Sequence, residues 1–123
     1  MSKYFYPAEM KCRCSRPACN ARQECVPDLL ARLDLVRDLY GKPMRVVSGL
    51  RCPTWNVLSK GTANSEHLTG EAADIVCETS QDRHELLIAG LRAFHRIGIG
   101  RLFLHFGCAS NLPPHVVWLY GTP

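Results

Sequence analysis

Ser65-Glu-His-Leu-Thr-Gly-Glu-Ala-Ala-Asp74 is the stretch of sequence that decides how this chain folds. It carries His67 and, seven positions later, Asp74. Imidazole and carboxylate groups are both common ligands of a divalent zinc ion. The spacing is too long for two ligands on successive turns of one helix, which lie three or four residues apart. It predicts a loop that presents His67, turns at Gly70 and enters a strand that carries Asp74 and continues into the apolar run 75–77.

A catalytic zinc site usually has a third protein ligand, and the best candidate here is His105. It lies in the hydrophobic run 102–106, which is bounded by glycines and predicts a core strand. A histidine in that strand would emerge next to the strand of Asp74. The alternative is that His67 is an ordinary loop histidine, Asp74 a cap and His105 a core histidine with satisfied nitrogens.

At 123 residues, the chain is expected to form a single domain, residues 1–123, with one modest core. Residues 1–25 lack periodicity and predict a loop-rich, cysteine-containing arm. Two main helices and a shorter one are expected: 27–40, 80–95 and 53–60. Strands are expected at 44–48, around Asp74, around His105 and at 116–120. Residues 97–100 are expected to turn the chain into the strand of His105, and the last strand to pair with it. The predicted fold class is α+β, a small antiparallel sheet flanked by two main helices.

Fifteen basic and eleven acidic residues give a net charge of +4, a mild bias toward anionic partners. No basic run resembles a nucleic-acid-binding arm, and no segment approaches the apolar length of a membrane span. The N-terminus has no apolar segment typical of a secretory signal. We therefore expect a protein that is made without a signal peptide and binds neither nucleic acid nor membrane. A monomer is also expected, although no sequence pattern bears on it.

Seven cysteines are many for a chain of 123 residues. Four of them, Cys12, Cys14, Cys19 and Cys25, lie close together in the sequence. Four thiolates can close a tetrahedral zinc site, but no paired C-x2-C spacing is present. Reduced thiols that pack as small apolar groups, or local disulfides, fit the pattern better than a second metal.

Several motifs occur in one order along the chain: Ser48-Gly-Leu-Arg-Cys-Pro53, Asn56, residues 61–67 and residues 70–75. This combination resembles the zinc D-alanyl-D-alanine carboxypeptidase family. That family includes phage endolysin peptidases, vancomycin-resistance dipeptidases and, distantly, the hedgehog signalling domain. Its pattern is Ser-Gly-Tyr-Arg, then Ser-x-His-x6-Asp, then a ligand histidine in a C-terminal strand. The resemblance extends from the 44–52 region to Trp118-Leu-Tyr120, with Leu50 in place of the usual tyrosine.

The resemblance implies a hedgehog/DD-peptidase-like fold and Zn²⁺ held by His67, Asp74 and His105. It implies a peptidase that hydrolyses peptidoglycan stem peptides, either as a DD-carboxypeptidase or as an endopeptidase, in the manner of phage lysins. In the family, the arginine at the position of Arg51 holds the substrate or polarises its carbonyl, and the serine at the position of Ser65 lies beside the substrate. A phage origin would make the protein cytoplasmic until release, or part of the virion.

The family's general base is missing from this sequence. Relatives place a glutamate three residues, or a histidine two residues, before the last ligand histidine, and those positions are Leu102 and Phe103. Another branch has an aspartate two residues after it, where this chain has Gly107. The remaining candidates are His115 and Glu66. A noncatalytic structural or cell-wall-binding relative with the same fold is therefore the alternative function.

A carboxylate beside the ligands could have a different role. Glu66 or Glu71 could orient a ligand histidine by accepting its second ring N–H, whereas the commoner role of such a residue is an exposed, solubilising charge.

Overall fold

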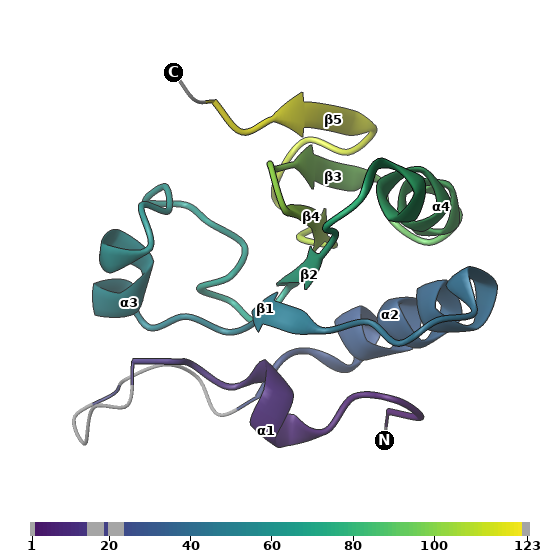
Figure 1. Ribbon diagram of the computed structural model, residues 1–123. Helices are drawn as coiled ribbons and strands as arrows, with labels where there is room; N and C mark the ends of the chain where they lie inside the picture. Colours follow the sequence, from purple (N-terminus) through teal and green to yellow (C-terminus); the bar gives the residue numbers. More distant parts are fainter. Residues whose placement is uncertain (1, 15–18, 20–23, 122–123) are drawn as a thin grey trace.

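A five-stranded sheet runs through the computed structural model, which describes residues 2–14, 19 and 24–121 (Figure 1). The order of the strands is β1-β2-β4-β3-β5. Their bounds are Val46–Ser48 for β1, Ala72–Val76 for β2, Arg96–Ile99 for β3, Phe103–Gly107 for β4 and Val116–Leu119 for β5. Neighbouring strands are antiparallel except β3 and β5, which are parallel. The α+β class is confirmed, with a mixed sheet instead of a purely antiparallel one.

Two predictions about the second half of the sheet are wrong. Residues 97–100 do not form a turn, because Arg96–Ile99 is strand β3. The last strand pairs with β3 and not with the strand of His105, since β2 and β3 already occupy both edges of β4. Gly98 conceals the third strand from sequence patterns, because glycine is depleted in strands.

Two helices cover one face of the sheet, α2 (Pro27–Tyr40) and α4 (Ser80–Leu91), while α3 (Pro53–Leu58) lies on the other side (Figure 1). Helix α2 has the predicted bounds. Helix α4 begins as predicted but is capped by Thr79, whose hydroxyl accepts a hydrogen bond from the backbone N–H of Asp82 at 3.0 Å. It ends before the predicted boundary at residue 95.

Side chains alternate between the two faces of the central strands, as the period of a β-strand requires. Ala73 and Ile75 of β2 and Leu104 and Phe106 of β4 belong to the hydrophobic core that packs against the helices. The intervening positions therefore face the opposite side of the sheet. The register of β2 and β4 pairs Asp74 directly with His105, so the strands bring together two residues that are far apart in the sequence.

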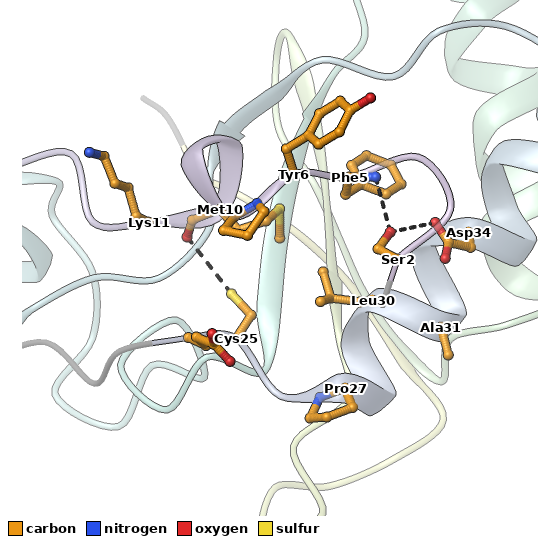
Figure 2. A pocket seen from close by; sticks show the side chains of 12 residues that line it. Ser2, Phe5, Tyr6, Met10, Lys11, Cys25, Pro27, Leu30, Ala31 and Asp34 are labelled. Atoms are coloured by element: carbon orange, nitrogen blue, oxygen red, sulfur yellow. Dashed lines mark hydrogen bonds between the residues drawn. The ribbon is translucent and has the colours of Figure 1, made fainter.

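The N-terminal arm packs along α2 and contains the short helix α1 (Pro7–Met10). The backbone N–H of Leu50 donates to the Met10 carbonyl at 2.8 Å, which ties the arm to the segment after β1. Ser2 Oγ donates to Asp34 of α2, and a cavity of about 660 Å³ lies between the arm and the helix (Figure 2). The thiol of Cys25 points to the Met10 carbonyl at 3.8 Å (Figure 2).

The predicted loop-rich arm is only partly described, because residues 15–18 and 20–23 lie outside the described residues. Among the described residues, no helix has both the length and the apolar character needed to cross a membrane.

Candidate metal centre

His67, Asp74 and His105 converge on the face of the sheet that the two long helices leave uncovered. Their ligand atoms all lie within 4.8 Å of one another, and all three side chains are buried. Asp74 Oδ1 is 3.3 Å from His67 Nε2 and 3.0 Å from His105 Nδ1. Zinc bonds to nitrogen and oxygen of about 2.0–2.1 Å place the ligands of a tetrahedral ion roughly 3.3 Å apart. The three groups can therefore hold a zinc ion with little rearrangement.

Each imidazole is fixed by a hydrogen bond on the side away from Asp74. His67 Nδ1 lies 2.7 Å from the Gly49 carbonyl, which can only accept, so this nitrogen carries the proton. His105 Nε2 lies 2.7 Å from the Glu66 carboxylate and is protonated for the same reason. In the neutral rings, the lone pairs are then on His67 Nε2 and His105 Nδ1, the two atoms next to Asp74. This is the arrangement of a histidine that binds a metal.

The electrostatics of the three groups favour a positive charge between them. Burial lowers the pKa of His67, so its ring stays neutral. Burial also acts to lower the pKa of His105, but hydrogen bonds to Asp74 and Glu66 outweigh it and raise that pKa. For Asp74, burial acts to raise the pKa, but the two imidazoles beside its carboxylate outweigh burial and lower that pKa, so the carboxyl stays ionised. A divalent cation would supply the charge that this site favours.

Arg51 contacts Asp74 Oδ2, the carboxylate oxygen that is not next to the two imidazoles. Its Nη2 lies 3.3 Å from Asp74 Oδ2, its Nε donates to Ser48 Oγ at 3.0 Å, and its Nη1 donates to Asn56 Oδ1 at 3.2 Å. The side chain is buried, and Asn56 also donates to the Thr62 carbonyl at 2.8 Å, which holds the loop that leads to His67. The sequence suggested a contact between Arg51 and the substrate, but not this link to a metal ligand.

Glu66 orients His105, one of three roles that the sequence left open for it, the others being a general base and an exposed charge. The carboxylate is 3% exposed and receives the His105 N–H, the Arg96 guanidinium at 3.1 Å and the Ala109 backbone N–H at 3.1 Å. Burial acts to raise the pKa of Glu66, but the hydrogen bond from His105 and these other donors lower it. A carboxylate with both oxygens occupied by donors is a poor proton acceptor.

Gly107 leaves the space that the Glu66 carboxylate fills. A Cβ atom built on Gly107 would lie only 1.9 Å from Glu66 Oε2. Gly107 is two residues after His105 in β4 and so on the same face of the sheet. The position that carries an aspartate in one branch of the family therefore has no side chain here, and a glutamate from the neighbouring loop reaches the same place.

A pocket of about 540 Å³ opens over the three ligands. Arg51, Lys60 and Arg96 contribute cationic groups to its lining, and Trp118 and Tyr120 of the β5 region contribute aromatic rings. The ring centroids of Trp118 and Tyr120 lie 5.2 Å and 6.3 Å from that of His105. A Cβ at Gly98 would overlap both rings, with closest approaches of 2.7 Å and 2.6 Å. The missing side chain in β3 is what allows the aromatic rings to reach the site.

Of the other candidate residues, Ser65 lies at the pocket and His115 does not. Ser65 lines the pocket, and its hydroxyl accepts from the His67 backbone N–H at 3.2 Å. His115 is exposed, packs its ring against His95 with centroids 4.9 Å apart, and does not line the pocket. The Glu71 carboxylate accepts from the Thr69 hydroxyl, and the ligand histidines are oriented by Gly49 and Glu66.

The family model for Peptidase M15 matches residues 3–106 of the chain. No curated protein matches it. Because this match covers most of the sequence, the chain belongs to Peptidase M15, the zinc D-Ala-D-Ala carboxypeptidase family of metallopeptidases. Members of this family are zinc metallopeptidases, and the triad described above is a site that can bind such a metal.

Sequence reasoning missed Arg96, Trp118 and Tyr120 as parts of the pocket. Arg96 pairs with Glu66 and also lies over the Trp118 ring at 5.2 Å. The available signal was the alternation of residues 116–120, which places Trp118 and Tyr120 on one face of a strand. The alternation alone does not place the two rings at the site, because their position depends on the pairing of β5 with β3.

Proposed function

We propose that this chain is a zinc peptidase that hydrolyses amide bonds in peptidoglycan stem peptides, as phage lysins and DD-carboxypeptidases do. The observation that carries the proposal is the convergence of three ligand atoms, with correctly directed lone pairs, at the base of a pocket that contains Arg51. A volume of about 540 Å³ is within the usual range of small-molecule sites and suits a short peptide segment.

Zinc held by His67, Asp74 and His105 would polarise the scissile carbonyl and lower the pKa of a bound water. The Gly49 carbonyl and the Glu66 carboxylate fix the directions of the two imidazoles. This placement removes the cost of orienting the ligands during the reaction.

Arg51 is suited to a second role in binding the substrate. A guanidinium has five N–H groups, and the contacts to Ser48, Asn56 and Asp74 use one on each nitrogen. One donor on each terminal nitrogen is left for a carbonyl or carboxylate of the peptide. Together with Lys60 and Arg96, Arg51 gives the pocket a cationic lining that suits the terminal carboxylate of a stem peptide.

Tyr120 is a candidate hydrogen-bond donor in this pocket. Burial raises its pKa to about 12, and nearby Asp74 acts in the same direction. The phenol therefore keeps its proton at neutral pH and can donate to oxygen that becomes negative during amide hydrolysis.

A dedicated general base is the component that the described part of the pocket lacks. Its only carboxylate besides Asp74 is Glu66, whose oxygens are occupied, and its only imidazoles are the two ligands. General acid–base catalysis typically contributes about 10²–10⁴-fold to rate. We therefore expect slower turnover than in relatives that have the base. This same observation supports the second candidate function, a zinc-binding relative that recognises wall peptides without cutting them.

The deciding experiment incubates zinc-loaded protein with purified peptidoglycan and with soluble stem pentapeptide, and analyses the products by mass spectrometry. Loss of a terminal D-alanine indicates carboxypeptidase activity, and cleavage within a stem or cross-link indicates endopeptidase activity. Either activity should stop with a chelator and return with zinc. If zinc-loaded protein binds the peptides but yields no product, the noncatalytic function is correct.

Arg51→Ala should lower kcat/KM by about 10²-fold or more, because the substrate loses a charged hydrogen-bond donor and Asp74 loses its support. Zinc content measured at saturating metal should stay at the wild-type value. Arg101→Ala, at an exposed arginine outside the pocket, is the control. Wild-type kcat/KM in Arg51→Ala would remove Arg51 from the proposed mechanism.

A further inference from the structure

A second group of potential metal ligands lies apart from His67, Asp74 and His105, which are hereafter called the peptidase site. Cys12, Cys14, Cys19 and Cys52 place their sulfur atoms within 4.8 Å of one another. A zinc–sulfur bond of about 2.3 Å places the sulfurs of a tetrahedral site roughly 3.8 Å apart. No disulfide is formed among the cysteines that the structure describes. We propose that these four cysteines, hereafter the cysteine cluster, bind a second zinc ion with a structural role.

The composition of the cluster favours this ion and this role. Four thiolates are a soft ligand set, which prefers zinc over hard cations such as magnesium or calcium. They fill all four positions of a tetrahedral ion and leave none for water or substrate, which distinguishes a structural site from a catalytic one. The peptidase site has the opposite character, with two nitrogens and one oxygen at the base of a pocket.

Backbone hydrogen bonds already point at two of the sulfurs. The N–H of Cys52 donates to Cys12 Sγ at 3.2 Å, and the N–H of Trp55 donates to Cys52 Sγ at 3.4 Å. Hydrogen bonds of this kind fix the direction of a ligand sulfur and stabilise its negative charge.

The cluster connects the N-terminal arm to the peptidase site. Cys12, Cys14 and Cys19 belong to the arm, whereas Cys52 directly follows Arg51 and caps α3. Helix α3 also carries Asn56, which accepts a hydrogen bond from Arg51. A zinc ion in the cluster would therefore fix the arm against the segment that holds Arg51. A metal that joins segments distant in the sequence adds its binding free energy to the stability of the fold.

Cys25 is close to the other arm cysteines in the sequence but is not part of the cysteine cluster. It is the fourth cysteine of the arm, and its thiol points to the Met10 carbonyl. Cys52 takes the fourth place instead, 33 residues after Cys19. Substitutions at Cys25 and Cys52 must therefore have different effects on metal content.

The test measures zinc per chain in full-length protein purified under reducing conditions. Wild type should contain two zinc ions, and His67→Ala should retain one. Adding Cys14→Ser or Cys52→Ser to His67→Ala should remove the remaining ion, whereas adding Cys25→Ser should not. With cobalt in place of zinc, His67→Ala should show the strong thiolate-to-cobalt charge-transfer absorption of a tetrathiolate site. Adding Cys14→Ser to His67→Ala should abolish this absorption.

A measurement on the wild type covers the case in which the cysteine variants do not fold. Native protein is alkylated with iodoacetamide, with and without a zinc chelator, and the labelled positions are identified by mass spectrometry. Cys12, Cys14, Cys19 and Cys52 should react only after zinc is removed. The proposal is overturned if His67→Ala contains no zinc, if Cys25→Ser removes as much zinc as Cys52→Ser, or if the chelator changes the labelling of none of the four. These results do not depend on whether the peptidase site turns over.

Discussion

The peptidase site and the cysteine cluster both bring potential ligands close together, but by different means. In both regions, the ligand atoms lie within 4.8 Å of one another. In the peptidase site, Asp74 and His105 are paired across β2 and β4, and each imidazole has a second hydrogen bond. In the cysteine cluster, three ligands come from an arm outside the sheet. In the first region, strand register places Asp74 opposite His105 and a loop adds His67, whereas the second region depends on where the arm lies.

This difference predicts that the two regions differ in how far their structure depends on bound zinc. The sheet and its hydrogen bonds can form the peptidase site before zinc arrives, so zinc should add catalysis with little effect on the fold. Cys12, Cys14 and Cys19 belong to no helix or strand of the described residues, so ordering this part of the arm and binding zinc should be one process. The predictions below test this contrast, beginning with the largest expected effect.

His105→Ala should reduce peptide cleavage to the level seen with a chelator, because the zinc loses one of three protein ligands. Zinc content should fall by one ion per chain, and the thiolate-to-cobalt absorption of the cysteine cluster should be unchanged. Metal analysis and cobalt spectroscopy on the same sample measure both sites. If the thiolate absorption is lost together with catalysis, the two regions are not independent.

Glu66→Gln should weaken zinc binding at the peptidase site by about 10–100-fold, the usual cost of removing a group that orients a ligand histidine. A titration against a competing chelator, performed on the Cys14→Ser background to remove the second site, measures this change. Glu71→Gln is the control, because the Glu71 carboxylate is bonded to the Thr69 hydroxyl and does not orient a ligand histidine. Equal affinities for Glu66→Gln and Glu71→Gln would mean that Glu66 does not support His105.

Gly107→Asp should lower the free energy of unfolding by about 1–3 kcal/mol, because the new side chain would overlap the Glu66 carboxylate. Adding Glu66→Ser should recover most of this loss, since the introduced carboxylate could then take the place beside Arg96 that Glu66 vacates. Urea denaturation of both single variants and the double variant gives the coupling energy.

The control for this cycle is Gly121→Asp, because a Cβ at Gly121 meets no atom within 4 Å. Additive effects of Gly107→Asp and Glu66→Ser would show that the two positions do not share one space.

The sequence was most informative where local patterns determine structure. The spacing of His67 and Asp74, and the hydrophobic run around His105, identified the three residues that the structure brings together. The bounds of α2 and the turn before β2 also followed from local signals, including Gly70 at a φ of 72°. These features depend on helical period, strand period and backbone freedom, which neighbouring residues largely set.

Local patterns were least informative about contacts between segments. The role of Glu66 remained open between a general base, an orienting carboxylate and an exposed charge, because nothing in the sequence shows that its carboxylate reaches the space above Gly107. Arg96 was missed because its partners are Glu66 and Trp118, which belong to other segments. The pairing of β5 with β3 was missed for the same reason, since strand order depends on which sheet edges remain open.

The sequence by itself determined the α+β class, the long helices, the family and the three residues, His67, Asp74 and His105, whose ligand atoms the structure brings together. Only the tertiary structure decided that Glu66 supports His105, that Arg51 supports Asp74, and that Cys52 joins the arm cysteines in place of Cys25. The physical reason is that periodicity and capping act over a few residues along the chain. Hydrogen bonds and metal coordination depend on distances of a few ångströms between atoms, which only the packed sheet, loops and arm define.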